Sequence, residues 1–271
     1  MLRLLKIELT KLYTNRFFRV LGALWIFAFF TIPVAFNYFL EWIQKNEPVG
    51  AEQFLKADQW PIFDFVDIWQ NLAYLYKMVT IFICFIVLAS VTNEFDYKTI
   101  RQNVIDGMSR REFWLSKIVF MLGISMLATI FLALIGFAVG YSLSPVTEPE
   151  FVFRNIEFMG AYFLQVFYLL MFCFVVSLLI KRAGFAFASI LFYIYILEPI
   201  TTLILSQKYK LELLADCFPS EAGWNLIRLP FEKYLLMYSQ DYVSYQDLGI
   251  ASVWLVIFLL VSYWLVNRRD L

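Results

Sequence analysis

Two ionisable residues, Lys77 and Glu198, interrupt stretches of the chain that are otherwise long and apolar. Charged side chains inside a hydrocarbon layer are costly, so they occur chiefly where they pair, reach the interface or line a polar pathway. For Lys77 the sequence favours a side chain that reaches the membrane surface or pairs with Asp64 or Asp67. A substrate-binding or gating role for Lys77 is the alternative.

Glu198 is followed directly by Pro199, which has no amide proton and frees a carbonyl in the preceding turn. The pair predicts a break in the helix at this point. A carboxylate beside such a break either completes the outer end of a shortened span or lines a pathway or gate. The sequence leaves both interpretations open.

The sequence lacks the residues and motifs on which most enzymatic chemistry depends. The chain has no histidine, and its three cysteines, Cys84, Cys173 and Cys217, form no metal-binding or redox spacing. It also has no glycine-rich phosphate loop of the kind that binds ATP. We therefore expect no catalytic residue, metal or cofactor in this chain, and any ATP-driven step requires a separate ATPase subunit.

The composition is typical of a membrane protein. Hydrophobic residues make up 62% of the chain and charged residues 16%, with a mean hydropathy of +0.70. A soluble domain of 271 residues has no core large enough to bury so much apolar surface. The formal net charge is zero, so no global positive field attracts nucleic acid.

Six apolar segments are close to the ~20 residues that cross the hydrocarbon core of a bilayer. They cover residues 20–40, 72–91, 115–143, 158–180, 185–205 and 248–266. Lys and Arg concentrate before the first segment, in the second and fourth connections and at the C-terminus, whereas the other connections are mostly acidic. By the positive-inside rule, we expect an all-α, six-span protein of the bacterial cytoplasmic membrane with both termini in the cytoplasm.

The connection at 92–114 carries the signals of a short helix. Thr92 or Asn93 can cap its N-terminus, with Glu94 in the first turn, where the helix dipole favours anions. The apolar residues that follow have the spacing of one helical face: Tyr97, Ile100 and Val104.

A stop and a second start follow in the same connection. Gly107 is a natural C-terminal stop for the first helix. Ser109 and Glu112 form a capping-box pattern that opens a second helix, which continues into the third apolar segment. Two capped helices on the basic side of the membrane predict a surface for a soluble partner.

This connection resembles the cytoplasmic signature of ABC-2 type transporter permeases, most closely the bacitracin- and lantibiotic-resistance type. The resembling residues are Glu94-Phe95, Thr99-Ile100-Arg101, Asp106-Gly107-Met108-Ser109-Arg110 and Ser116-Lys117. The resemblance implies that the connection docks on an ABC ATPase subunit and that two permeases associate as a homodimer or heterodimer. The implied coupling residues are Glu94, Tyr97, Thr99, Ile100, Arg101, Val104, Gly107, Ser109, Arg110 and Arg111.

Two further regions are expected at the membrane surfaces. Residues 1–19 carry leucines on one helical face, which predicts an interfacial amphipathic helix; a basic flank that only orients the first span is the alternative. Residues 206–247 hold apolar stretches too short to span, which predicts re-entrant or interfacial helices on the outer side. Gly136 and Gly140 predict close helix packing, either within the chain or across a dimer.

Together these features predict the permease subunit of an ATP-driven transporter that exports an amphipathic or hydrophobic substrate by alternating access. The alternatives are a permease-like assembly or regulatory protein and an ATP-independent carrier, which would need more polar residues inside its spans. An intramembrane protease that relies on histidine is excluded. Co-purification with an ATPase, or an ATPase gene beside this one, would separate the alternatives.

Overall fold

A computed structural model describes residues 8, 10–11, 13–45, 62–97, 99–105, 107–230, 240 and 242–268. These residues form helices and turns and no strand. The long helices are α2 (Arg16–Lys45), α3 (Ile68–Asp96), α5 (Arg110–Leu143), α7 (Glu157–Leu179), α8 (Ala183–Phe192) and α13 (Tyr245–Arg268). The short ones are α4 (Thr99–Ile105), α6 (Pro149–Val152), α9 (Glu198–Leu203), α10 (Glu212–Asp216) and α11 (Pro219–Trp224), with π-helical turns η2 (Tyr193–Leu197) and η3 (Ile204–Lys208).

Six helical segments of the described chain are long and apolar enough to cross a membrane. They are Arg16–Phe39, Ile68–Asp96, Arg110–Leu143, Pro149–Leu179, Ala183–Lys208 and Tyr245–Arg268. Their outward faces expose large apolar side chains, among them Phe27, Phe30, Ile200, Leu203, Val256 and Leu260. So much exposed apolar surface is unusual for a soluble protein, and it indicates a multi-pass membrane protein.

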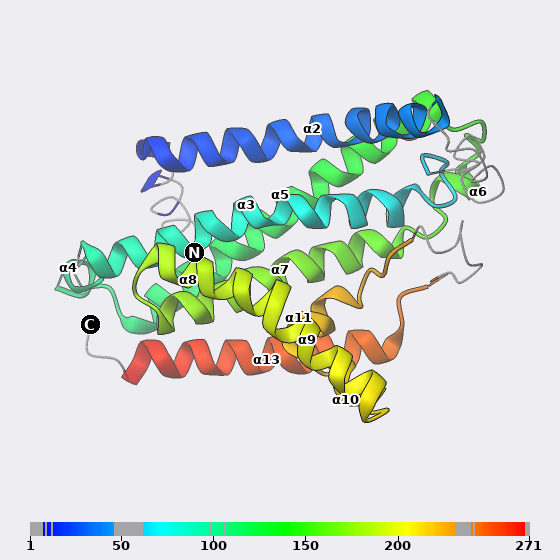
Figure 1. Cartoon of the computed structure of the whole chain (residues 1–271). Coiled ribbons are helices and arrows are strands. Elements are labelled where there is room, and N and C mark those ends of the chain that lie inside the picture. Colours follow the sequence, from blue (N-terminus) through cyan, green and yellow to red (C-terminus); the bar gives the residue numbers. More distant parts are fainter. Residues whose placement is uncertain are drawn as a thin grey trace.

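The bundle is built around α3 and α7, which pack along each other and are the most buried of the long helices. α2 and α13 lie on opposite sides of this pair (Figure 1). The start of α2, the end of α13 and α4 share one end of the bundle, which we call the α4 end; α6 lies at the other, the α6 end (Figure 1).

A proline anchors α2 to the centre of the bundle. Pro33 lies inside α2 and has no amide proton, so the carbonyl of Phe29, four residues earlier, loses its helical partner. The hydroxyl of Tyr76 in α3 donates to this carbonyl at 2.8 Å, and the rings of Phe29 and Tyr76 stack with centroids 4.1 Å apart. The carbonyl that Pro33 leaves without a helical partner therefore forms a hydrogen bond that joins α2 to α3.

Gly136 and Gly140 of α5 lie against large aromatic side chains of the same chain. A Cβ at Gly136 would lie 2.7 Å from the Trp69 ring, and one at Gly140 would lie 2.5 Å from the Phe65 ring. Of the two arrangements expected for this pair, the structure has close packing within one chain.

The fifth long segment is continuous through Pro199, and the expected break is wrong. The π-helical turn at Tyr193–Leu197 precedes the proline, and the Glu198 amide donates to the Tyr193 carbonyl, five residues earlier. A proline ring clashes with the carbonyl four residues before it in a regular helix. The wider π turn changes the spacing of these carbonyls, so the segment continues to Lys208.

The regions between and before the spans are described in part. Glu8, Thr10, Lys11, Tyr13 and Thr14 are helical, whereas the rest of the expected interfacial helix before Tyr13 lies outside the described residues. Asn15 interrupts the helix, and its side chain accepts from the Phe17 amide at 3.0 Å. The first long helix therefore begins at Arg16, before the expected residue 20. In the region 206–247, the short helices α10 and α11 match the expectation of segments too short to span.

Candidate functional site

The helix preceding the 92–114 connection is longer than expected. α3 continues without interruption to Asp96, so neither Thr92 nor Asn93 caps a new helix. The buried Thr92 hydroxyl instead donates to the Leu88 carbonyl within α3, at 2.8 Å. The N-cap expectation was wrong because a Thr-Asn-Glu sequence is also compatible with a helix interior when the hydroxyl bonds back to the preceding turn.

The short helix of the connection is α4, which begins only at Thr99 and projects from the end of the bundle (Figure 1). Ile100 is buried, whereas 78% of Tyr97 and 72% of Ile105 are exposed. Tyr97 ends α3 as its C-cap residue, so it does not share a helical face with Ile100 as expected. The side chains of Arg101 and Val104 lie outside the described part of the structure.

The turn from α4 into α5 has the expected conformation. Gly107 has a φ of 94°, a left-handed value that a residue with a Cβ adopts only with strain. The Ser109 hydroxyl accepts from the Glu112 amide at 3.2 Å, and the Glu112 carboxylate accepts from the Ser109 amide at 2.8 Å. This reciprocal pair is the predicted capping box, and it sets where α5 begins.

Arg110 and Arg111, expected to pair with a partner, contact the end of α13. The Arg110 guanidinium donates to the Asn267 carbonyl, and Arg111 Nε donates to the Tyr263 hydroxyl at 3.0 Å. Trp114, one turn further along α5, donates from Nε1 to the Ser262 hydroxyl at 2.9 Å. These bonds join the start of α5 to the end of α13 beside α4.

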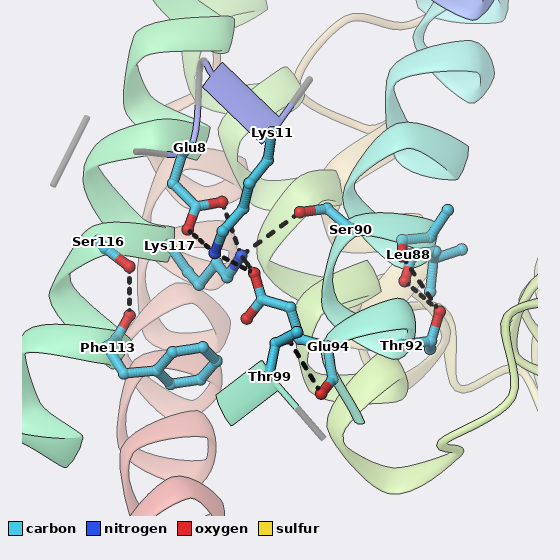
Figure 2. A network of polar contacts seen from close by, with 11 residues as sticks. Glu8, Lys11, Leu88, Ser90, Thr92, Glu94, Thr99, Phe113, Ser116 and Lys117 are labelled. Carbon is cyan, nitrogen blue, oxygen red and sulfur yellow. Dashed lines mark hydrogen bonds and ion pairs between the residues drawn. The ribbon is translucent and has the colours of Figure 1, made fainter. Parts of the chain in front are cut away.

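Beneath α4 lies a group of four charged residues that we call the ion cluster: Glu8, Lys11, Glu94 and Lys117 (Figure 2). The Lys117 ammonium lies 2.7 Å from a carboxylate oxygen of Glu8 and 2.7 Å from one of Glu94. Lys11 approaches the same Glu94 oxygen at 2.8 Å and Glu8 at 3.4 Å. The cluster therefore joins the N-terminal segment, the end of α3 and the start of α5.

The ion cluster is balanced in charge, and three of its four members are buried, whereas Lys11 is partly exposed. Lys117 is 2% exposed, and it also donates to the Ser90 hydroxyl at 3.4 Å. Buried ions are expensive to desolvate, and they are tolerated when each is paired and hydrogen-bonded. Burial raises the pKa of the Glu8 carboxyl, but Lys117 and then Lys11 outweigh this effect and hold the pKa below its usual value.

Glu94, expected at the coupling surface, belongs to this cluster and is 4% exposed. Its backbone carbonyl accepts from the Thr99 hydroxyl at 3.4 Å, which holds the first residue of α4 against the end of α3 (Figure 2). The sequence analysis missed the pairing of Glu94 with Lys117 and Glu8. One signal was present, because Glu8 is the one acidic residue among the basic residues of 1–19.

Lys77, in the half of α3 nearer the α6 end, is buried against α11. Its ammonium lies 3.6 Å from the centroid of the Trp224 ring and donates to the Trp224 carbonyl at 3.4 Å. In the described part of the chain no ion pair includes Lys77, so the expected pairing with Asp64 or Asp67 is wrong. Lys77 also does not extend to the surface, because it is 9% exposed.

A cavity of about 30 Å³, which we call the Lys77 cavity, lies between α3, α7 and α11. Its lining includes Lys77, Gln165, Leu169, Phe172 and Trp224. The Gln165 amide nitrogen donates to the Gly223 carbonyl at 2.7 Å, whereas its buried amide oxygen has no partner among the described residues. The cavity thus combines a cation and a free acceptor with apolar and aromatic walls.

Glu198 binds the N-terminal end of α11, the short helix whose C-terminal end contacts Lys77. Its carboxylate is fully buried, and one oxygen accepts from the amides of Ser220 and Glu221 at 2.7 and 2.8 Å. These are two of the amides that a helix N-terminus leaves without partners, and the helix dipole favours a negative charge there. Glu198 and Lys77, which the sequence analysis considered separately, therefore meet at α11, with the anion at its start and the cation at its end.

The described residues contain no group of three or more His, Cys, Asp or Glu side chains that could hold a metal ion. A protein-family model, described as Protein of unknown function (DUF2705), matches residues 30–271. The match includes Lys77, Glu94, Lys117 and Glu198 but not the N-terminal partners of the ion cluster, Glu8 and Lys11. A search of the curated proteins finds no match to the chain.

Proposed function

The chain belongs to the family described as Protein of unknown function (DUF2705), and we propose that it is the membrane permease subunit of an ABC exporter. In this proposal the substrate is amphipathic or hydrophobic, and two permeases enclose its pathway. Separate ATPase subunits bind the α4 end of the bundle, which faces the cytoplasm. ATP-driven movement of α4 rocks the spans between inward- and outward-facing states.

The observation that carries the proposal is the position of α4 and the exposure of the residues around it. This helix connects two membrane-spanning helices, α3 and α5, and its residue Ile100 is buried. Tyr97, just before α4, and Ile105, at its end, are exposed. An exposed tyrosine at the end of α3 and an exposed isoleucine at the end of α4 suit an apolar contact with a soluble partner. The residues also lie within the segment that resembles the ABC-2 signature.

The ion cluster and the α13 contacts explain how a force applied to α4 would reach the spans. The ion cluster links the end of α3 to α5 and the N-terminal segment, and the Thr99 hydroxyl at the base of α4 donates to the Glu94 carbonyl. Arg110 and Arg111 link α5 to α13. A rigid mounting transmits displacement because packed elements move as bodies rather than deform continuously. The Lys/Arg-rich α4 end is the cytoplasmic end by the positive-inside rule.

The proposal predicts that the exposed residues of the α4 region carry the contact with the ATPase. Tyr97→Asp and Ile105→Asp each place a charge in an apolar interface, and each should reduce co-purification of a co-expressed ABC ATPase at least tenfold. Tyr209→Asp is the matched control, because Tyr209 is 57% exposed and lies after the fifth span, away from α4. The ATPase should remain bound in this control.

Tyr97→Asp, Ile105→Asp and the control should insert and unfold like the wild type, since the altered side chains are exposed. Permease-stimulated ATP hydrolysis should fall in proportion to the lost binding. If ATPase binding and hydrolysis are unchanged in Tyr97→Asp and Ile105→Asp, α4 is not the docking surface and the proposal loses its basis.

A further inference from the structure

We propose that the Lys77 cavity binds the carboxylate of an amphipathic acid, whose apolar chain lies along α7. This inference rests on the proposed function and names the class of substrate that the exporter would carry. The ligand carboxylate would contact the Lys77 ammonium, and the chain would follow Leu169 and Phe172 toward the middle of the bundle.

The first argument is the charge of the site. Lys77 is more than nine-tenths buried, and among the described residues its ammonium contacts the rings of Trp224 and Tyr74 and donates one long hydrogen bond to a carbonyl. Glu221 of α11 acts on it electrostatically but forms no ion pair with it. A cation so placed retains capacity for an anion, because an ammonium has three donors and the cost of its burial falls when it is paired.

The second argument is the size and polarity of the cavity. A volume of about 30 Å³ holds roughly two water molecules. The two oxygens of a carboxylate fit in place of two such waters, whereas a phosphate group with four oxygens is larger. The unpartnered amide oxygen of Gln165 can accept from a donor beside that carboxylate, either a hydroxyl or an amide of the ligand.

The third argument is the direction of the apolar wall. α7 starts at the α6 end and runs toward the α4 end, so Leu169 and Phe172 lie about 6 and 10 Å deeper along the helix than Gln165. Both line the cavity, as does Val166. The hydroxyls of Thr80 and Tyr168, which also line the cavity, donate to carbonyls of the chain. The cation and the free acceptor therefore lie nearer the α6 end than Leu169 and Phe172, which is the orientation that an amphiphile adopts in one leaflet.

The fourth argument is the position of α11. Its Trp224 ring lies over the ammonium and lines the cavity. α11 has six residues and is tied down by bonds from Glu198, Gln165 and Tyr168 to its backbone. An aromatic ring on such a short segment can move aside without unfolding a span.

The test is saturable binding of radiolabelled dodecanoate to the purified full chain in a neutral detergent, at a pH at which the acid is ionised. We expect unlabelled dodecanoate to displace the label, and dodecan-1-ol and dodecyl phosphate to do so at least tenfold less well. Lys77→Met should weaken dodecanoate binding at least tenfold. Lys208→Met, the same change at an exposed lysine, should bind like the wild type.

Absence of saturable binding, or equal displacement by dodecan-1-ol, would overturn the proposal without reference to any variant. Unchanged binding in a folded Lys77→Met protein would overturn the role of Lys77, and equal displacement by dodecyl phosphate would overturn the choice of a carboxylate. The assay contains no ATPase. If dodecanoate does not bind but the ATPase still co-purifies, only the proposed substrate class is rejected. If dodecanoate binds but the ATPase does not co-purify, only the proposed ATPase partner is rejected.

Discussion

Lys117→Met is expected to destabilise the protein by about 3–5 kcal/mol, because it leaves two carboxylates without their shared cation in a buried site. Glu8 and Glu94 each lie 2.7 Å from the Lys117 ammonium, and both are nearly inaccessible to water. Lys11 would remain as their one partner in the ion cluster. In a thermal unfolding experiment in detergent the apparent Tm should fall by roughly 10 °C.

Lys181→Met is the matched control, since Lys181 is exposed at the start of the fifth span and its ammonium lies 5.4 Å from the centroid of the Phe95 ring. Its effect should stay below about 1 kcal/mol. Adding Glu8→Gln and Glu94→Gln to Lys117→Met should restore much of the lost stability, because the unpaired charges are then gone. Equal stability of Lys117→Met and Lys181→Met would show that the ion cluster does not form as described.

The same experiment has a defined pH dependence. The pKa of Glu8 is lowered in the folded protein, so its contribution to stability is present above the unfolded pKa and is lost as the pH falls through the folded one. The Tm difference between the wild type and Lys117→Met should therefore shrink in acid. A difference that is constant from neutral pH to pH values below the glutamate range would contradict a role for the charged carboxylates.

Glu198→Leu is expected to have an effect of similar size, at about 1–3 kcal/mol for each of the two amides that it leaves unpaired at the start of α11. The carboxylate now accepts from both Ser220 and Glu221. Glu198→Gln keeps an acceptor oxygen of the same size, so it should retain most of the stability. Thermal unfolding of both variants measures this difference.

Glu212→Leu is the control for Glu198→Leu, because Glu212 is exposed in the neighbouring helix α10. Its Tm should remain close to that of the wild type. If Glu198→Leu is as stable as Glu212→Leu, the carboxylate does not hold α11. A loss of stability in Glu198→Leu with normal ATP turnover per folded molecule would assign Glu198 to structure and remove the gating role considered from the sequence.

Long continuous apolar segments made the long helices predictable, because membrane spans must satisfy their backbone within the helix and expose apolar side chains to lipid. The capping box at Ser109 and the stop at Gly107 were likewise predictable, since each depends on contacts within four residues. Helix ends that depend on distant contacts were not. α3 passes through Thr92 to Asp96, where Glu94 meets Lys117 and Glu8 from elsewhere in the chain.

The same distinction between local and distant contacts explains which parts of the candidate site were predictable. Lys77 and Glu198 stand out in the sequence because charge is rare inside apolar segments, but their shared target, α11, follows only from how three spans pack. The effect of Pro199 was misjudged because a π-helical turn, which has no clear sequence signal, removes the need for a break. Gln165 and Trp224 were not singled out as a pair, because neither residue is unusual until they share a cavity with Lys77.

The central claim, that α4 is the cytoplasmic docking element for an ABC ATPase, is tested most directly by photocrosslinking in intact cells. A photoreactive phenylalanine replaces Ile105 in α4 or, as a control, Glu148 at the α6 end, which is also exposed. We predict that position 105 crosslinks to a protein containing an ATP-binding phosphate loop and that position 148 does not. Crosslinking of the ATPase from position 148, or of no ATPase from position 105 when the complex is present, would contradict the account.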